Sequence, residues 1–287
     1  MKRRSDRAVR KVEVFRSLLF CPATRPERFA KAVTSGADIV CIDLEDSVAP
    51  GRKAEARRNA LTYFAGQQHT SATRILRINS PRGAEGLHDL VALVEAPRLP
   101  DGLMLPKVVS GEEVRWIGDL LPDPVLIPMI ETPQALAEVA AIAGASDRVR
   151  AVAFGSWDYA AEVGSDTSWD ALLYARGRLA SAAAAQGIVA LDGVWVGLDD
   201  EAGLRAEATR VAALGFGGKL AIHPRQIPVI HGAFNPSPTD IAWARKVVEA
   251  FANAADGVVV VDGRMVDAPL VLAARRTLAT AARMKAG

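Results

Sequence analysis

The sequence predicts an α/β fold, a parallel (β/α)8 TIM barrel with a C-terminal helix-hairpin-helix extension. Short apolar, β-branched segments alternate with longer segments rich in Ala, Arg, Glu and Leu, which is typical of parallel strands covered by helices. Charged residues directly follow several of the apolar segments, as they do in barrels that carry an active site at the carboxyl ends of their strands. No glycine-rich dinucleotide-binding loop follows the first strand, which argues against an open doubly wound sheet.

Eight strands are expected, each followed by a helix or a connecting segment. At the end of the fifth strand, Thr132 and Pro133 suit the N-cap and the first position of a helix. This register places Glu131 on the solvent-facing rim of the barrel mouth. The expected strands cover residues 15–20, 38–43, 74–79, 102–106, 125–130, 150–155, 188–191 and 219–222.

The chain divides into three expected parts. Residues 1–14 are basic and are expected to be disordered, as chain termini often are. Residues 15–235 are expected to form the barrel, which would be the catalytic domain if its mouth carries the active site. Residues 236–287 form an extension whose apolar faces are expected to pack on a neighbouring subunit.

The region after the last strand breaks the alternation of strands and helices. Residues 223–238 are interpreted as a loop, and residues 239–255 as an amphipathic helix. A hairpin turning at Asp262 and Gly263 follows, and a last helix occupies residues 268–287. The homo-oligomer expected from the exposed apolar faces depends on this tail.

Composition and charge exclude several classes of protein. Half of the residues are hydrophobic and the net charge is only +2, so a large buried core is expected. No apolar run approaches the ~20 residues that span a bilayer, and no signal peptide is evident, which favours a cytoplasmic protein without a membrane partner. Outside the N-terminus there is no aromatic-studded basic face, so no nucleic acid is expected. Cys21 and Cys41 fall within predicted strands and are expected to be buried and reduced.

Two carboxylates stand beyond the ends of neighbouring predicted strands. Glu131 follows VLIPMI, and Asp158 follows VAFGSW. With no His or Cys beside them, they form an oxygen-only pair of the kind that suits Mg²⁺. The alternative is that each is a helix cap or part of a surface ion pair, and Asp158 is placed to cap the segment that starts YAAEVG.

Three further charged residues are candidates at the same mouth. Arg77 suits a substrate carboxylate, which a guanidinium binds through two parallel hydrogen bonds, although a structural ion pair with Asp43 or Glu45 stays open. Lys107 has the position of a Schiff-base nucleophile, or of a cation that balances Glu45 and Asp46. The carboxylate pair nearby favours the electrostatic role for Lys107.

An ordered series of motifs runs through the chain, namely SLLFCPATRPERFAKA, DIVCIDLEDSVAP, RINSP, LPKV, IPMIETPQAL, AFGSWDY and GKLAIHPRQI. Together they resemble the beta subunit of citrate lyase and the malyl-CoA, citramalyl-CoA and citryl-CoA lyases of the HpcH/HpaI aldolase superfamily, over about residues 15–285. The resemblance implies a barrel assembled as a homotrimer or hexamer. It also implies Mg²⁺ held by Glu131 and Asp158, with Arg77 on the carboxylate of a 2-oxo acid.

The resemblance also implies a substrate and a role for the tail. In malyl-CoA and citramalyl-CoA lyases, an acid from the C-terminal hairpin of an adjacent subunit enters the active site, and GRMVDAP places Asp267 at that position. The implied reaction is reversible cleavage of a 3-hydroxyacyl-CoA into acetyl-CoA and a 2-oxo acid. The catalytic candidates are Arg77, Asp267, Glu45 and Lys107, while Arg25 and Arg28 are candidates for binding the CoA thioester and its phosphates.

The chain departs from the family pattern at two points. FGSWDYAAEVG carries Glu162 where the common pattern has Asp, and GVWVGLDD differs after the seventh strand. Two other functions stay open, a CoA-independent pyruvate-type aldolase and a catalytically silent assembly subunit. Asp267 argues against the aldolase, and the intact set of candidates argues against the silent subunit.

Overall fold

The chain forms two compact units in a computed structural model that describes residues 15–66, 72–252 and 257–284. The first unit is Met1–Ala233 and the second is Phe234–Gly287. The predicted basic segment 1–14 lies outside the described residues.

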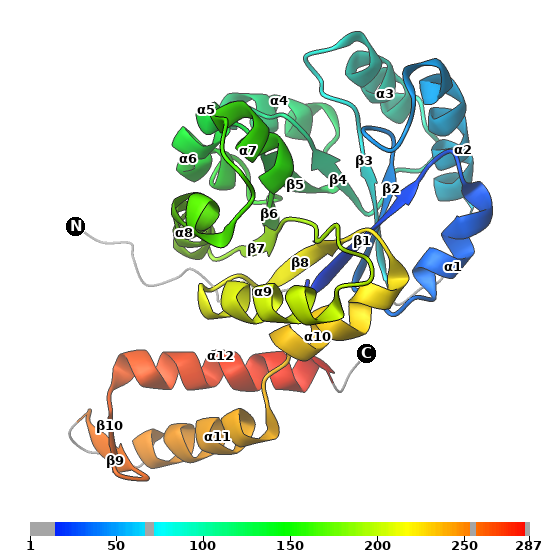
Figure 1. The fold of residues 1–287 in the computed structure, drawn as a ribbon. Helices are drawn as coiled ribbons and strands as arrows, with labels where there is room; N and C mark the ends of the chain where they lie inside the picture. Colours follow the sequence, from blue (N-terminus) through cyan, green and yellow to red (C-terminus); the bar gives the residue numbers. More distant parts are fainter. Residues whose placement is uncertain (1–14, 67–71, 253–256, 285–287) are drawn as a thin grey trace. The chain divides into compact units, whose positions relative to one another are not determined.

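The first unit is a closed barrel of eight parallel strands, which confirms the predicted fold (Figure 1). The strand order follows the chain order, and β1 pairs with β8 to close the barrel. Each strand overlaps one of the eight predicted segments. The strands are β1 (Ser17–Pro22), β2 (Ile39–Asp43), β3 (Thr73–Arg77), β4 (Gly102–Leu105), β5 (Val125–Ile130), β6 (Ala151–Phe154), β7 (Val189–Asp192) and β8 (Gly218–Ala221).

Helices lie between the strands and surround the barrel (Figure 1). Thr132 accepts a hydrogen bond from the N–H of Ala135 and Pro133 follows it, so the predicted helix start is confirmed. The helices of this unit are η1 (Pro26–Arg28), α1 (Phe29–Val33), η2 (Pro50–Arg52), α2 (Lys53–Ala65), α3 (Ala84–Val94), α4 (Gly111–Leu120), α5 (Pro133–Ala137), α6 (Val139–Ala143), α7 (Ser156–Val163), α8 (Trp169–Gln186), α9 (Glu201–Ala213), η3 (Pro224–Gln226) and α10 (Ile227–Phe234).

The barrel interior is a packed core. Side chains from all eight strands contribute to it, among them Leu18, Met104 and Leu220, and these three are almost completely buried. Cys41 belongs to the same core, and Cys21 and Cys41 are both free and buried, as predicted. Because the interior of such a barrel is filled by side chains, charged residues gather at the carboxyl ends of the strands.

The interpretation of residues 223–238 as a loop is wrong. The segment forms η3 and α10. The His223 side chain accepts a hydrogen bond from a main-chain N–H of η3, and the Gln226 side chain accepts one from the main-chain N–H of His223, so a capping box starts the helical segment. Ile227 and Ile230 are buried, and their burial stabilises the helix.

The second unit is the predicted helix-hairpin-helix. It consists of α11 (Pro238–Ala252), β9 (Val259–Val261), β10 (Arg264–Val266) and α12 (Ala268–Met284). The hairpin turns at Asp262 and Gly263, whose φ angles of 48° and 77° are typical of the primed turns that suit two-stranded hairpins. Packing of this unit on a neighbouring subunit stays a prediction. Over the described residues, every helix is too short or too polar to cross a bilayer.

Candidate active site

Four of the predicted site residues come from consecutive strands. Arg77 is the last residue of β3, and Glu131 follows β5 directly. Glu45 and Lys107 lie just beyond the ends of β2 and β4. Because β2, β3, β4 and β5 are neighbours in the barrel, the four side chains meet at one side of its mouth.

Arg77 is buried and makes ion pairs with acidic residues from β2 and the loop after it. Its Nε and Nη2 donate to the two carboxylate oxygens of Asp43, each at 2.7 Å, and its Nη1 lies 2.9 Å from Oε2 of Glu45. Burial opposes ionisation, yet the charge and hydrogen bonds of Arg77 hold the pKa of Asp43 below its usual value. The structural ion pair that the sequence left open is therefore present. The sequence named Asp43 as a possible ion-pair partner of Arg77, but not as a site residue.

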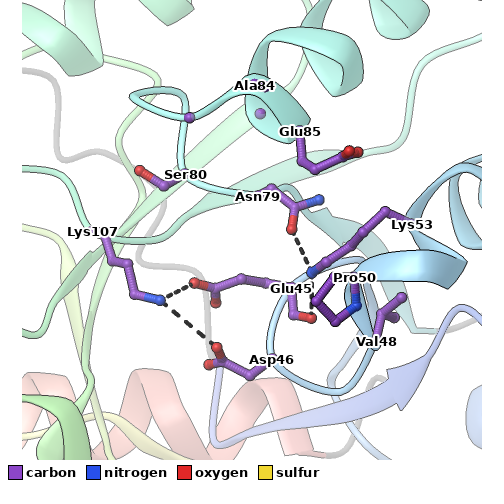
Figure 2. A pocket seen from close by; sticks show the side chains of 12 residues that line it. Glu45, Asp46, Val48, Pro50, Lys53, Asn79, Ser80, Ala84, Glu85 and Lys107 are labelled. Atoms are coloured by element: carbon purple, nitrogen blue, oxygen red, sulfur yellow. Dashed lines mark hydrogen bonds and ion pairs between the residues drawn. The ribbon is translucent and has the colours of Figure 1, made fainter.

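Lys107 lies against two carboxylates of the loop after β2 (Figure 2). Its Nζ is 2.8 Å from Oε1 of Glu45 and 3.7 Å from Oδ1 of Asp46. Although partial burial works in the opposite direction, these carboxylates raise the pKa of Lys107, so its amine stays protonated. A protonated amine is a poor nucleophile, and this geometry favours the electrostatic role over a Schiff base.

A cavity of ≈ 500 Å³ opens beside these residues and is lined by Glu45, Asp46, Lys107 and the start of α3 (Figure 2). Glu45 is 5% exposed, and burial raises its pKa although Arg77 and Lys107 lower it. Lys53 fixes one wall, because its Nζ donates to the carbonyls of Leu44 and Glu45 and to Oδ1 of Asn79, at 2.6 to 2.8 Å. Nothing in the sequence singled out Lys53, since the loops that it joins are separate in the chain.

Glu131 is 1% exposed, so the expectation that it faces solvent on the rim is wrong. Its Oε1 accepts a hydrogen bond from the main-chain N–H of Lys107. Its Oε2 is buried and has no hydrogen-bond partner among the described residues. Burial, and then the charge of Glu45, raise the pKa of Glu131 to about 8.

Asp158 lies exposed in the first turn of α7. That helix starts at Ser156 after Gly155 as its N-cap, so the alternative of Asp158 as a helix cap is wrong. The strands β5 and β6 pair side by side as predicted, and the charge of Asp158 contributes to the raised pKa of Glu131.

Gly155 lies close to Glu131, at a position that the sequence did not single out. A Cβ built on it would lie 2.7 Å from Oε2 of Glu131, so a larger residue would displace the carboxylate. Glycine is the residue that permits such a close approach.

The residues at the mouth fit a hard divalent cation. The donors of Glu131 and Asp158 are oxygens only, which Mg²⁺ prefers. A buried carboxylate oxygen without a partner is costly, and a cation would satisfy Oε2 of Glu131. No cluster of three or more His, Cys, Asp and Glu side chains suited to a metal occurs in the described chain, so any ion here would complete its coordination with water or substrate.

Three further predicted residues lie on other elements. Arg25 and Arg28 are exposed just after β1, and Arg25 lies 3.8 Å from Glu27 in a weak ion pair. Asp267 is partly buried in the second unit, between β10 and α12. Their roles stay predictions.

The barrel and its charged mouth are those of an enzyme. Residues 16–224 match the HpcH/HpaI aldolase/citrate lyase family, and the chain belongs to it. A (3S)-malyl-CoA thioesterase of Cereibacter sphaeroides is 37% identical over 272 residues, or 93% of this chain and 94% of the relative. The mitochondrial citramalyl-CoA lyase of Homo sapiens is 33% identical over 293 residues, covering 94% and 86%. The resemblance predicted from the motifs is confirmed.

A solved structure supports the same assignment. Protein CitE from Mycobacterium tuberculosis, in complex with magnesium, acetoacetate and coenzyme A, matches this chain with a TM-score of 0.80 and 36% identity, over 94% of this chain and 98% of that one.

Proposed function

We propose that this protein is a Mg²⁺-dependent carbon–carbon lyase that reversibly cleaves a 3-hydroxyacyl-CoA, such as malyl-CoA, citramalyl-CoA or citryl-CoA, into acetyl-CoA and a 2-oxo acid. The observation that carries the proposal is the buried Oε2 of Glu131, which has no hydrogen-bond partner in the part of the chain that the structure describes, with Arg77 and Lys107 at the same mouth. The relatives named as acting on malyl-CoA and citramalyl-CoA support the substrate class.

Glu131 and Asp158 would hold the Mg²⁺ ion. When bound, Mg²⁺ supplies Lewis-acid polarisation of oxygen atoms at a site where the protein leaves positions open. Gly155 keeps the approach to Oε2 clear on one side.

Arg77 orients the carboxylate of the substrate. Asp43 fixes its Nε and Nη2, while Nη1 contacts Glu45 and, at 3.3 Å, Asp46. The side chain of Asp46 is 52% exposed, so its contact is weak and an incoming carboxylate can replace it. A carboxylate held there has a fixed orientation toward the cavity.

The cleavage transfers two protons. The bond between the hydroxyl-bearing carbon and the carbon next to the thioester breaks, and its electron pair goes to the thioester side. The hydroxyl group loses a proton as it becomes the carbonyl of the 2-oxo acid, and the acyl-CoA carbon gains one. We assign the first transfer to Glu45, whose pKa burial raises, and the second to Asp267 of a neighbouring subunit. Lys107, whose Nζ lies 2.8 Å from Oε1 of Glu45, stabilises the negative charge that Glu45 carries before it accepts the proton.

The proposal includes the remaining expectations from the sequence. Arg25 and Arg28 bind the phosphates of CoA, because guanidinium groups suit phosphate oxygens. The protein assembles as a homotrimer or hexamer in the cytoplasm, which supplies the neighbouring Asp267.

One assay tests the function. Purified protein is incubated with Mg²⁺ and malyl-CoA, citramalyl-CoA or citryl-CoA, while acetyl-CoA, the 2-oxo acid and free CoA are each measured. Acetyl-CoA and 2-oxo acid in equal amounts support the lyase. Free CoA without 2-oxo acid would assign thioester hydrolysis instead. This outcome has to be measured because one relative is named a thioesterase. Cleavage of a free 4-hydroxy-2-oxo acid alone would assign a CoA-independent aldolase.

A further inference from the structure

Lys107 has an unusual backbone conformation for a lysine. Its φ is 52°, and within the described ranges Asp262 is the one other non-glycine residue with positive φ. The left-handed region is unfavourable for residues with a Cβ, and it persists where the surroundings hold the residue there. Asp262 lies in a hairpin turn, where this conformation is expected. Lys107 instead lies at the mouth of the barrel.

The two ends of Lys107 contact two different carboxylates. Its main-chain N–H donates to Oε1 of Glu131, and its Nζ lies 2.8 Å from Oε1 of Glu45. The angle φ sets the direction of the side chain relative to the N–H of the same residue. A left-handed φ therefore allows one residue to reach Glu131 on one strand end and Glu45 on another.

The hydrogen bond from Lys107 determines which oxygen of Glu131 stays free. With Oε1 bonded to the main chain, Oε2 is left without a partner among the described residues. Gly155 leaves room for Oε2 in this position, because a Cβ there would lie 2.7 Å from that oxygen. The hydrogen bond from the Lys107 main chain and the missing side chain of Gly155 are therefore both compatible with a single placement of the carboxylate.

A glycine would adopt this backbone without strain. It would, however, leave Glu45, which is 5% exposed, without one of its two nearby cations. A buried carboxylate without a partner is strongly disfavoured. The lysine side chain explains why a strained residue occupies the position that glycine would fill more easily.

We infer that Lys107 is a positioning residue, whose left-handed main chain fixes Glu131 with Oε2 free for a divalent cation while its ammonium group balances Glu45. The inference rests on the proposed function in one respect, that Glu131 is a ligand of the cation. It assigns to the main chain of Lys107 a role that its side-chain chemistry does not reveal.

The test measures the affinity of the full chain for Mn²⁺ without substrate. The paramagnetic resonance signal of free Mn²⁺ reports how much of the ion is unbound. Lys107→Asn removes the ammonium but tolerates a left-handed backbone, and Lys107→Val removes the ammonium and disfavours that backbone through its branched Cβ. We expect Lys107→Val to bind Mn²⁺ about tenfold more weakly than Lys107→Asn, because only a minor fraction of the protein keeps the binding conformation. Turnover should fall in both variants, since both lose the cation beside Glu45.

A matched control and a second replacement distinguish the loss of the hydrogen bond to Glu131 from a general effect of a branched residue in a left-handed backbone. Asp262→Val places the same branched residue at the other left-handed position and should leave Mn²⁺ binding unchanged. Replacement of Lys107 by its α-hydroxy acid, through nonsense suppression, exchanges the N–H for an oxygen and keeps the side chain. This ester should also weaken Mn²⁺ binding, because it cannot donate the hydrogen bond to Glu131. It therefore keeps the inference testable if thermal unfolding shows that Lys107→Val folds poorly.

The outcomes distinguish this inference from the function on which it rests. One outcome overturns the positioning role while the cation site stands. In it, the wild type binds Mn²⁺ and Glu131→Gln does not, but Lys107→Val binds as tightly as Lys107→Asn and the ester binds as tightly as the wild type. If the wild type binds no Mn²⁺, both the inference and the proposed cation site fail. Weakened binding in Lys107→Val and in the ester, with normal binding in Asp262→Val, supports the inference.

Discussion

Arg77 and Asp43 are paired through two parallel hydrogen bonds of 2.7 Å, between the last residues of adjacent strands β3 and β2. The guanidinium also lies over the ring of Phe20, with 4.6 Å between the guanidinium carbon and the ring centroid. Asp43 and Phe20 together fix the plane of the guanidinium. A substrate carboxylate would therefore meet a donor whose orientation is already set, which lowers the entropic cost of binding.

Arg77→Lys should weaken catalysis although it keeps the charge. A lysine cannot make the two parallel bonds to Asp43, so the loss in kcat/KM should correspond to about 1.5–3 kcal/mol, the range for a charge-assisted hydrogen bond. Steady-state kinetics with the preferred acyl-CoA measures it. Arg52→Lys, at an exposed ion pair with Glu55, is the control and should leave kinetics unchanged. Unaltered kinetics in Arg77→Lys would assign Arg77 to structure alone.

Glu131→Gln and Asp158→Asn should each abolish Mg²⁺-dependent turnover while the barrel stays folded. The neutral amides keep the size of the side chains but lose the charge that hard cations require. Activity at increasing Mg²⁺, with circular dichroism as a check on folding, measures the effect. Glu162→Gln, an exposed position on the same helix as Asp158, is the control. Full activity of the wild type in excess EDTA would contradict the metal assignment.

The raised pKa of Glu131 predicts a pH dependence of stability without metal. Burial and the charge of Glu45 raise its pKa from 4.5 to about 8 in the folded protein. Between these values the folded state holds a proton that the unfolded state has released, so stability should fall as pH rises, by at most about 1.4 kcal/mol per pH unit from this group.

Urea unfolding in EDTA between the two pKa values measures this contribution as the difference between wild type and Glu131→Gln. The glutamine variant lacks the titrating group and should show a flatter dependence. With saturating Mg²⁺ the trend should weaken or reverse, because the cation binds the ionised carboxylate. An identical pH dependence for both proteins in EDTA would place the pKa of Glu131 near its ordinary value.

Gly155→Ala should impair cation binding more than its small size suggests. The added methyl group would occupy the space beside Oε2 of Glu131 and push the carboxylate away. We expect at least a tenfold loss of Mn²⁺ affinity, since a ligand displacement equivalent to about 1.4 kcal/mol already gives that factor. Gly177→Ala on α8, where nothing lies within 4 Å of the added atom, should bind Mn²⁺ as the wild type does. Equal affinities for the two variants would show that the carboxylate adapts.

Asp267→Asn should assemble normally yet lose most cleavage activity. A positioned acid typically contributes 10²–10⁴-fold, a range taken from general acid–base catalysis. Mixing this variant with Asp158→Asn, under conditions of subunit exchange, should restore part of the activity if the site is shared. Mixtures that never exceed the two parents, despite exchange shown by mass spectrometry, would place Asp267 in its own subunit's site or outside catalysis.

The sequence was sufficient for the fold because its signals were local. Apolar runs located the eight strands, and Thr132 with Pro133 located a helix start that the structure confirms. The interpretation of residues 223–238 as a loop failed because the burial of Ile227 and Ile230 stabilises a helix there. Tertiary contacts of this kind leave no periodic signal in so short a segment.

The sequence predicted which charged residues lie at the barrel mouth better than it predicted their contacts and burial. The strand-end rule brought Arg77, Lys107 and Glu131 to one place, since parallel strands end on the same side. It gave no information on depth, so the burial of Glu131 was missed. The contributions of Gly155 and of the Lys107 main chain depend on backbone angles and close approaches, which side-chain chemistry does not indicate.

The pairing of β1 with β8 has a consequence for folding. Ser17, Leu18 and Leu19 pair with Lys219, Leu220 and Ala221, so the barrel closes between strands at opposite ends of the unit. On a ribosome, β1 emerges long before its final partner is made, and its free edge must wait for almost the entire unit to be synthesised. Contacts between such distant segments slow folding, because the entropy of the long loop is lost before the pairing is gained. Barrel closure is therefore a late event in the biogenesis of this protein, and chains that terminate before β8 expose an unpaired β1 edge that favours aggregation.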